Sequence, residues 1–265
     1  MVSIGFLGAG NMGEALIKGI LQSEPKANIG FIEAQPERVK YIQKVYKIKA
    51  LKTITDLGDY DICLVAIKPQ TLPLIMSDLA SVLPKKVMIV SIAAGITLKY
   101  FRSYFKQNKL VRVMPNTPAL IGMGMSGIAF STNCTEKDQK TVTQIFKSVG
   151  QVIIVKESQI NAVTALSGSG PAYFFHLAHL YASCGPKLGL SYNQALLLMT
   201  QTMSGAAHLL QSSEKKPEEL IRMVASPGGT TAAALKILQD TKLSDMIGLS
   251  VLAAKTRAEE LSKTK

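Results

Sequence analysis

In the first half of the chain, short apolar runs alternate with segments that have helical spacing. The run Val2–Leu7 is apolar almost throughout, which is typical of a strand covered on both faces of a sheet. The alternation predicts βαβ units and a parallel sheet. The expected strands are Val2–Leu7, Ile29–Glu33, Asp61–Ile67, Val87–Ala93, Leu110–Met114, Ser126–Ser131 and Val152–Val155, and the expected helices are Asn11–Gln22, Pro36–Val45, one that starts at Pro69, and Lys137–Ser148.

From about Ser158 the pattern changes to long segments rich in Ala, Leu and Met. Helical spacing predicts an all-helical domain over 159–265, after an α/β domain with a doubly wound, mostly parallel sheet over 1–158. Gly185-Pro186 should kink or break its helix. Stretches such as Ala195–Met199 are apolar most of the way round, so they need burial against partner subunits. The expected helices are Gln159–Thr164, Ala172–Cys184, Tyr192–Gln211, Pro217–Val224, Thr231–Gln239 and Leu243–Leu261.

The sequence GAGNMG at Gly8–Gly13 is a G-x-G-x-x-G motif that follows a predicted strand and opens a predicted helix. In that context the motif predicts a dinucleotide site. Gly8 allows a tight turn, Gly10 lets the backbone approach a pyrophosphate, and Gly13 permits close helix–strand packing. The helix N-terminus then offers amide groups to the phosphates. The first domain is therefore expected to be Rossmann-like and to bind NAD or NADP.

Glu33 stands at the end of the second predicted strand, where an acidic side chain accepts hydrogen bonds from the adenosine ribose. A carboxylate there would also repel a 2′-phosphate, so Glu33 favours NAD(H). Gln35 and Arg38 are close enough in sequence to meet a 2′-phosphate if the loop turns toward it. The motif thus specifies a dinucleotide and leaves the choice between NAD and NADP open.

Three more segments follow predicted strands at the carboxyl edge of the sheet, where open α/β sheets bind ligands. Small residues there, such as Ala93, leave room for a nicotinamide ring, and Lys68 can meet ribose or phosphate oxygens. Asn116 offers both a donor and an acceptor; alternatively, the neighbouring prolines shape a loop and Asn116 caps a turn. The segments are Ala66–Pro69, Ser91–Gly95 and Met114–Pro118.

Two segments rich in Gly and Ser interrupt the second domain. Ser167–Pro171 is expected to be a loop before a long helix, and it is no nucleophile elbow because no strand leads into it. Ser226–Thr231 places two glycines and two threonines at a helix start, which predicts a cradle for a carboxylate or phosphate. An ordinary N-cap is the alternative for the second segment.

Composition narrows the class of protein. Of 265 residues, 47% are hydrophobic and 18% charged, so the chain can bury a core and is not globally disordered. No apolar run approaches the roughly 18 residues that span a bilayer, and the N-terminus lacks the basic segment of a signal peptide; no membrane partner is expected. Three widely spaced cysteines build no disulfide framework, which favours the cytoplasm.

The formal net charge is +12, but the basic residues are dispersed along the whole chain. Nucleic-acid binding would leave a clustered basic footprint, so we expect a solvated basic surface that attracts small anions and no nucleic-acid partner. His176 and His179 lie three apart on one predicted helix without a third ligand. No metal site is expected.

The segments GAGNMG, AIKP, SIAAG, VMPNTPA, ALSGSGPAY and SPGGTT, in that order, resemble the pyrroline-5-carboxylate reductases over nearly the whole chain. The resemblance implies reduction of 1-pyrroline-5-carboxylate to L-proline by NADPH or NADH, the last step of proline biosynthesis. It also implies a homodimer formed by the helical domain, with possible further assembly into a decamer. The active site would lie between one subunit's cofactor domain and helices of its partner.

The resemblance further implies roles for individual residues. The pyrophosphate would be held by Gly8, Ala9, Gly10, Asn11 and Met12. The nicotinamide ribose would be flanked by Ala66, Lys68 and Pro69. The substrate carboxylate would be bound by Ser226, Gly229, Thr230 and Thr231. The Thr231 hydroxyl would lie close to the ring nitrogen as the catalytic group.

Two positions depart from the family pattern. Relatives often carry small polar residues where Glu33 stands, and they commonly prefer NADPH, whereas Glu33 favours NADH. Arg222 stands where relatives often have an acid. Two other functions fit parts of the chain: a β-hydroxyacid dehydrogenase, disfavoured because the helix after Pro171 has no lysine before Lys187, and a non-catalytic dinucleotide sensor.

Overall fold

The computed structural model describes residues 2–263, which fall into two compact units. The first, here called the sheet unit, contains the chain up to Ser169 and the C-terminal segment from Ala254; the second, the helical unit, is Gly170–Ala253. The sequence predicts a dinucleotide-binding domain over 1–158 and a substrate-binding domain over 159–265. A compact unit need not be a functional domain, so this division stays a prediction.

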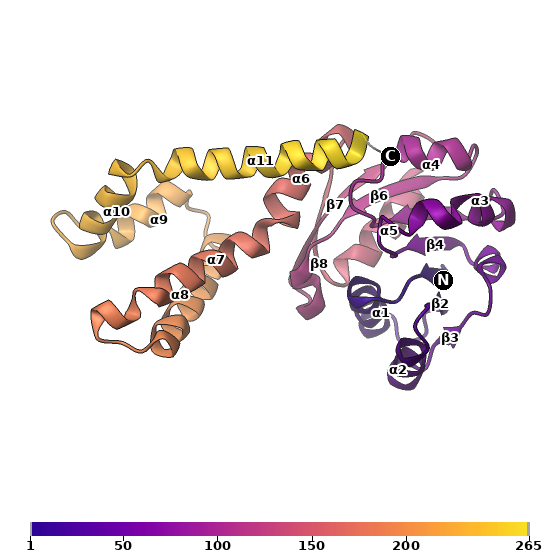
Figure 1. The fold of residues 1–265 in the computed structure, drawn as a ribbon, viewed down its shortest axis with the longest axis horizontal. Helices are drawn as coiled ribbons and strands as arrows, with labels where there is room; N and C mark the ends of the chain where they lie inside the picture. The colour runs from indigo at the N-terminus through magenta and orange to yellow at the C-terminus, as the bar shows by residue number, and fades with distance from the viewer. Residues whose placement is uncertain (1, 264–265) are drawn as a thin grey trace. The chain divides into compact units, whose positions relative to one another are not determined.

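The sheet unit contains one eight-stranded sheet with the order β3-β2-β1-β4-β5-β6-β7-β8 (Figure 1). Neighbouring strands are parallel except for β6 and β7, so β7 and β8 run opposite to the others. The predicted doubly wound, mostly parallel sheet is confirmed. The strands are β1 Ile4–Leu7, β2 Ile29–Ile32, β3 Lys49–Ala50, β4 Ile62–Val65, β5 Met88–Ser91, β6 Leu110–Met114, β7 Gly124–Phe130 and β8 Gly150–Ile154.

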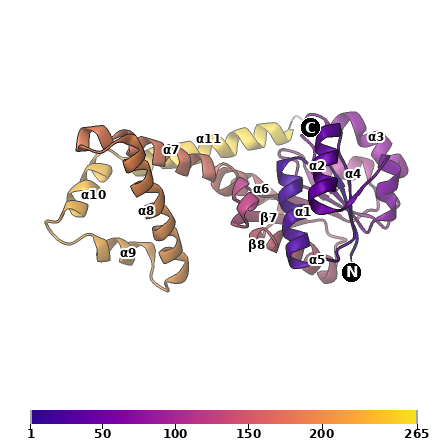
Figure 2. The same cartoon turned by 90° about the horizontal axis from the view of Figure 1, so that it is seen from below.

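Helices cover both faces of this sheet (Figures 1 and 2). One face carries α1 Asn11–Ser23, α2 Pro36–Tyr46 and α5 Glu136–Lys147, and the other carries α3 Leu72–Val82 and α4 Leu98–Tyr104. Successive strand residues alternate between the two cores: Leu64 packs in the first and Val65 in the second. Burial on both faces explains why the strands are apolar without alternation.

Some predicted boundaries were wrong. The helix expected from Pro69 starts at Leu72, because the Thr71 N–H donates to Lys68 O (3.0 Å) in a turn and Pro73 takes the first-turn position instead. Strand β7 begins at Gly124 rather than at residue 126. The short β3 and the helix α4 were not predicted, since neither is long enough to show a clear period.

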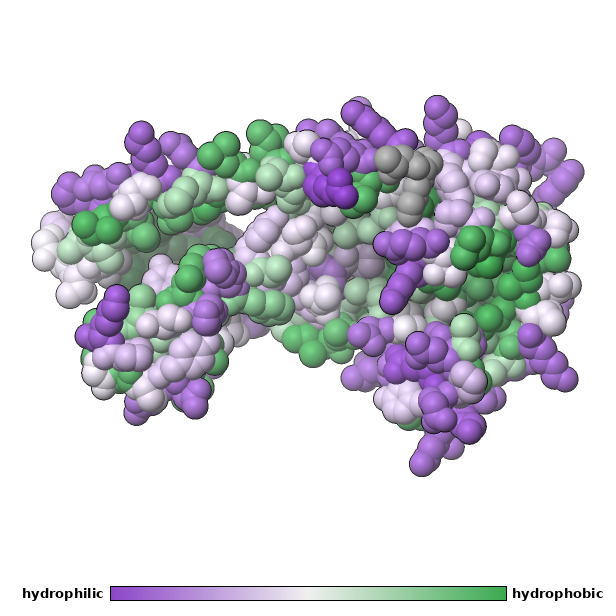
Figure 3. Space-filling model, in the orientation of Figure 1, coloured by the Kyte–Doolittle hydropathy of each residue, from purple (hydrophilic) through white to green (hydrophobic). Residues whose placement is uncertain are grey.

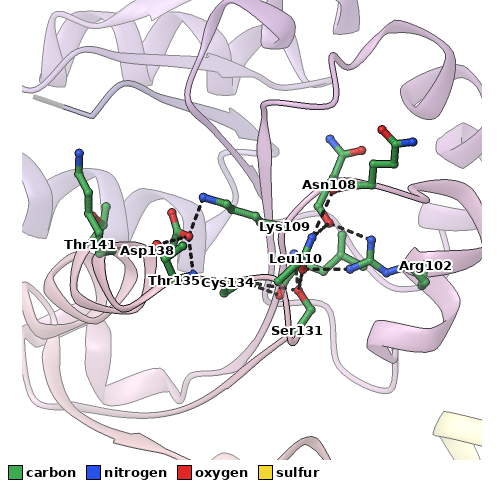
Figure 4. Close-up of polar contacts among 12 residues, drawn as sticks. Arg102, Asn108, Lys109, Leu110, Ser131, Cys134, Thr135, Asp138 and Thr141 are labelled. Atoms are coloured by element: carbon green, nitrogen blue, oxygen red, sulfur yellow. Dashed lines mark hydrogen bonds and ion pairs between the residues drawn. The ribbon is translucent and has the colours of Figure 1, made fainter.

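Polar contacts fix the start of β6 (Figure 4). The Arg102 guanidinium donates to the carbonyls of Phe105 (3.0 Å), Lys106 (3.0 Å) and Asn108 (2.9 Å). The Leu110 N–H donates to the Ser131 Oγ at 2.9 Å. These bonds fix the amino end of β6. The carboxyl end of β6 leads into the predicted site segment Met114–Pro118.

The helical unit contains α7 Gly170–Ser183, α8 Tyr192–Ser212, α9 Pro217–Val224, α10 Thr230–Asp240 and the first part of α11 Leu243–Lys263 (Figure 2). As predicted, the first long helix ends before Gly185-Pro186, where a short 3-10 turn, Gly185–Leu188, follows.

This unit buries few side chains. Its fully buried residues include small ones, such as Ala178, Ala182 and Ala195, whereas many large apolar side chains are exposed, and Figure 3 shows apolar residues on the surface along α11. Large apolar side chains exposed together in this way are typical of an interaction surface. The most exposed are Phe175, Leu188, Leu197, Val224 and Leu249.

The segment expected to be a Gly/Ser loop before the long helix is helical instead. Helix α6 (Ile160–Val163) continues into a π-turn, Thr164–Gly168, in which the Ser169 N–H donates to Thr164 O at 2.8 Å. The Ser167 hydroxyl donates to Val163 O at 3.1 Å. The small residues therefore widen one helical turn rather than interrupt the helix, and α7 follows directly.

Candidate functional site

The glycine-rich turn joins β1 to α1 at the carboxyl edge of the sheet. Gly8 has φ +99°, and a Cβ there would lie 2.8 Å from Ala66 O, so the turn requires glycine. A Cβ on Gly13 would lie 2.7 Å from Gly8 O, which lets α1 begin against the turn. Gly10, at φ −65°, has nothing within 4 Å of a Cβ position. Open space thus lies in front of Gly10.

Helix α1 begins at this turn without a side-chain cap. Gly10 is its N-cap, and no side chain accepts a hydrogen bond from its first amide groups. Gly10 and Asn11 are exposed and Met12 is half-buried. Uncapped amide donors with the positive end of a helix behind them and free space in front fit the pyrophosphate of a dinucleotide.

The Glu33 carboxylate lies against the glycine-rich turn. One oxygen accepts the Ala9 N–H at 3.0 Å, and the other accepts the Gln35 N–H at 3.1 Å. Glu33 therefore holds the turn and its own loop together. Since each oxygen has further lone pairs, the carboxylate can still accept hydrogen bonds from a ribose.

Arg38, considered above as a partner for a 2′-phosphate, is engaged within the unit. Its Nε donates to Ala9 O at 2.9 Å, and it forms an ion pair with Glu14. The guanidinium carbon lies 5.3 Å from the centre of the Tyr41 ring, a cation–π contact. Arg38 thus stabilises the glycine-rich turn through its hydrogen bond to the Ala9 carbonyl.

Glu14 pairs with Arg38 and so helps to hold it against the turn, a role that the sequence analysis did not predict. The Tyr46 hydroxyl donates to Glu14 at 2.7 Å, which links the first turn of α1 to the end of α2. Partial burial acts to raise the pKa of Glu14, but the hydrogen bond from Tyr46 and the pairing with Arg38 outweigh it and leave the pKa lowered. No local motif marks Glu14, because both of its partners lie more than twenty residues away.

Strand β4 lies next to β1 in the sheet, and β5 lies next to β4 on its other side. Ala66 is half-buried and its N–H donates to Leu7 O at 2.8 Å, which brings it next to Gly8. Lys68 is exposed, Pro69 half-buried and Ala93 buried. The structure therefore brings the predicted cofactor residues of three strand ends to one edge of the sheet.

Asn116, after β6, uses both ends of its amide inside the sheet unit. Its Oδ1 accepts the Met125 N–H at 2.8 Å, and its Nδ2 donates to Ser167 O at 3.1 Å in the π-turn. The side chain is buried, with 9% of the residue exposed. The Asn116 side chain makes no capping hydrogen bond to the 3-10 turn Thr117–Ile121 that follows it, so it does not cap that turn as the alternative had it. Its contact with a cofactor stays a prediction.

The predicted substrate loop lies in the helical unit, before α10. The Gly229 N–H donates to Ser226 O at 3.0 Å, and Gly228 has φ +72°, so the chain makes a tight turn. Gly229 is the N-cap of α10, and no side chain caps the helix. Thr230 is exposed and Thr231 half-buried. The first amides of α10 have no side-chain cap, so they are available to an anion. Arg222 is exposed on α9.

Among residues 2–263, no group of three or more His, Cys, Asp or Glu side chains is arranged to hold a metal ion. No helix in this part of the chain is long and apolar enough to cross a membrane.

Two protein-family models match the chain. The model described as pyrroline-5-carboxylate reductase dimerisation matches residues 157–261, and the model described as NADP oxidoreductase, coenzyme F420-dependent, matches residues 3–95. The helical unit therefore lies within a dimerisation region, and the glycine-rich turn within an oxidoreductase region.

Curated relatives align over nearly the whole chain. The pyrroline-5-carboxylate reductase of Pseudomonas aeruginosa is 38% identical over 264 residues, covering 98% of this chain and 97% of the relative. The enzyme of that name from Arabidopsis thaliana is 34% identical and covers 98% and 96%.

Solved structures agree. A pyrroline-5-carboxylate reductase from Coxiella burnetii superposes with a TM-score of 0.94 at 30% identity, covering 98% of both chains. The pyrroline carboxylate reductase of Plasmodium falciparum, solved with NADP bound, superposes with a TM-score of 0.86 at 28% identity, again covering 98% of both chains. Relatives of this name align over nearly the full length of the chain, share its fold and have the dimerisation region that matches it. This chain therefore belongs to the pyrroline-5-carboxylate reductase family.

Proposed function

We propose that this oxidoreductase reduces 1-pyrroline-5-carboxylate to L-proline with a reduced nicotinamide dinucleotide. The observation that carries the proposal is a pair of uncapped helix starts, one in each unit, at α1 and α10. The first suits a pyrophosphate and the second suits a carboxylate. The reaction needs both anions held, since cofactor and substrate each carry one.

Gly8, Ala9, Gly10, Asn11 and Met12 would bind the pyrophosphate. The open space at Gly10 allows the phosphates to approach the backbone, and a side chain there would occupy it. Ala66, Lys68, Pro69 and Ala93 would line the nicotinamide end, where the small Ala66 and Ala93 leave room for the ring. When bound, the dinucleotide supplies the hydride.

In the helical unit, Gly229, Thr230 and Thr231 would hold the substrate carboxylate, with the Ser226 carbonyl shaping the turn. The Thr231 hydroxyl would orient the ring nitrogen and relay its proton. A protonated imine is already electrophilic, so the enzyme needs no strong general acid. Placement of the ring can supply up to about 7–11 kcal/mol of the lowered barrier.

We propose NADH as the preferred donor. The Glu33 carboxylate is fixed by the Ala9 and Gln35 N–H groups, so its negative charge cannot swing away from a 2′-phosphate. Arg38, the nearest candidate to neutralise that phosphate, is committed to Glu14. The matching NADP oxidoreductase model and the relative with NADP bound favour the opposite choice, and initial rates with the two donors side by side decide between them.

We also propose a homodimer, which in turn can assemble further, up to a decamer. The large exposed apolar side chains of the helical unit need a second copy to cover them, and the family's dimerisation region spans that unit. Each active site would then combine a glycine-rich turn and an α10 start from two subunits. Three cysteines outside any disulfide favour the cytoplasm as the compartment.

The decisive experiment follows absorbance at 340 nm with 1-pyrroline-5-carboxylate and NADH or NADPH. We expect turnover by the wild type, and a loss of kcat/KM of about 10–1,000-fold in Thr231→Ala, comparable to removing one transition-state donor. Thr231→Ser keeps the hydroxyl and is the matched control, expected to retain most activity. A protein that binds the dinucleotide but never oxidises it would be a sensor, and equal kinetics in Thr231→Ala would remove Thr231 from the mechanism.

A further inference from the structure

A groove of about 780 Å³ opens on the sheet unit, outside the set of residues assigned to cofactor and substrate. Its volume is in the range of small-molecule sites. It lies among α4, the middle of β6, the segment that leads into α6 and the C-terminal end of α11. Its lining residues are Thr97, Lys99, Tyr100, Ser103, Arg112, Glu157, Ser158, Asn161, Ser262 and Lys263.

Arg112 lies in this groove with only 5% of the residue exposed. A charge buried this deeply is normally paired at short distance. Its guanidinium lies at long distance from its two acceptors, Glu157 Oε1 at 3.5 Å and Asn161 Oδ1 at 3.4 Å. Charge-assisted hydrogen bonds of an arginine usually measure about 2.7–2.9 Å. The Arg112 charge is therefore poorly compensated.

Both acceptors of Arg112 are also shared with other donors. Glu157 Oε1 accepts the Leu98 N–H at 2.6 Å, and Asn161 Oδ1 accepts the Ser262 hydroxyl at 3.3 Å. Burial lowers the pKa of Arg112, and the charge of Glu157 only partly opposes this. The shorter bonds belong to the other donors, so the guanidinium has donor capacity left for a further acceptor.

The rest of the lining adds positive charge and hydroxyl groups. Lys99 and Lys263 contribute two cations from α4 and α11, against the one carboxylate of Glu157. The Tyr100 hydroxyl oxygen is buried without a hydrogen-bond partner among the described residues. A buried polar group left without a partner is unfavourable.

We propose that this groove is a binding site for a small oxyanion, a carboxylate or phosphate group carried by a metabolite. Arg112 holds the oxyanion at the floor, and Lys99 and Lys263 hold it from the two sides. The site is separate from the catalytic one, because none of its lining residues belongs to the glycine-rich turn, the ends of β4 and β5 or the loop before α10.

The experiment is calorimetric titration of the full-length protein with inorganic phosphate and, separately, with succinate. Each titration is run with and without saturating NADPH at constant ionic strength, so that binding at the glycine-rich turn is recognised by its loss. We expect saturable binding that NADPH leaves unchanged. Stronger binding of phosphate assigns a phosphorylated ligand, and stronger binding of succinate assigns a carboxylate.

Lys99→Gln and Lys263→Gln should each weaken the bound probe by about five- to tenfold, as expected for one lost charge-assisted contact. Lys85→Gln, an exposed lysine outside the groove, is the matched control and should bind like the wild type. The proposal is overturned if neither probe saturates, if NADPH abolishes the binding, or if both groove variants bind as the wild type does.

Discussion

Gly10→Ala separates the two possible roles of the glycine-rich turn. If the glycines serve only to fold the turn, a methyl group at Gly10 should be harmless, because no atom lies within 4 Å of its Cβ position and φ is −65°. If a pyrophosphate approaches the backbone here, the same methyl group occupies its place. The structure thus predicts a variant that folds normally and binds the dinucleotide poorly.

The effect on folding should be small. Alanine is a poorer N-cap than glycine, which costs up to about 1 kcal/mol, while the lower entropy of the unfolded chain returns about 0.4–1 kcal/mol. The effect on binding should be large. Displacing the phosphates from one amide donor removes a charge-assisted hydrogen bond of about 1.5–3 kcal/mol, so Kd should rise by about 10- to 150-fold.

Gly8→Ala provides the contrast. Its φ of +99° and the Ala66 carbonyl oxygen 2.8 Å from the added Cβ mean that this variant strains the fold itself. It should lose about 2 kcal/mol or more of unfolding free energy. Thermal unfolding and NADH fluorescence titration of both variants make the comparison. Wild-type affinity in a stable Gly10→Ala protein would refute the placement of the pyrophosphate.

Two further predictions concern carboxylates near the turn. Glu33→Gln removes the charge that faces a 2′-phosphate and should raise the NADPH-to-NADH ratio of kcat/KM about tenfold, equivalent to about 1.4 kcal/mol of relieved repulsion. Glu37→Gln, on the exposed surface of α2, is the control and should leave this ratio unchanged. If Glu33→Gln also leaves the ratio unchanged, Glu33 does not determine the choice of donor. Glu14 has a lowered pKa in the fold, so it stabilises the protein above its ordinary pKa of 4.5, and this contribution is lost as pH falls through the folded value. Glu14→Gln should therefore show a smaller fall in Tm on acidification than the wild type, and parallel curves would contradict the pairing with Arg38 and Tyr46.

The βαβ pattern was predictable because its elements are local. Strands Ile62–Val65 and Met88–Ser91 lie inside the predicted apolar runs Asp61–Ile67 and Val87–Ala93, although they are shorter, and the helix after Gly10 begins at Asn11 as predicted. The reversed direction of β7 could not be predicted, since strand direction depends on pairing with β6 and not on the composition of either strand.

The candidate site was harder to read where a residue has long-range partners. Glu33 was expected to face a ribose, and its hydrogen bonds to Ala9 and Gln35 depend on how the loop folds back. Ser167–Pro171 was expected to be a loop because Gly and Ser favour turns, yet helix α6 continues into a π-turn, Thr164–Gly168, that includes the first two of these residues. The spacing of apolar residues in the sequence does not reveal that one helical turn contains an extra residue.

The scarcity of buried side chains in the helical unit has a consequence for how the protein is handled. A unit that buries so few of its own large apolar residues would gain much of its stability from the proposed association, so folding and assembly would be thermodynamically linked. For a dimer, each tenfold dilution lowers the free energy of unfolding by about 1.4 kcal/mol. Melting temperatures measured at different protein concentrations are then different quantities, and a dilute enzyme assay reports on a less stable molecule than a concentrated crystallisation drop contains.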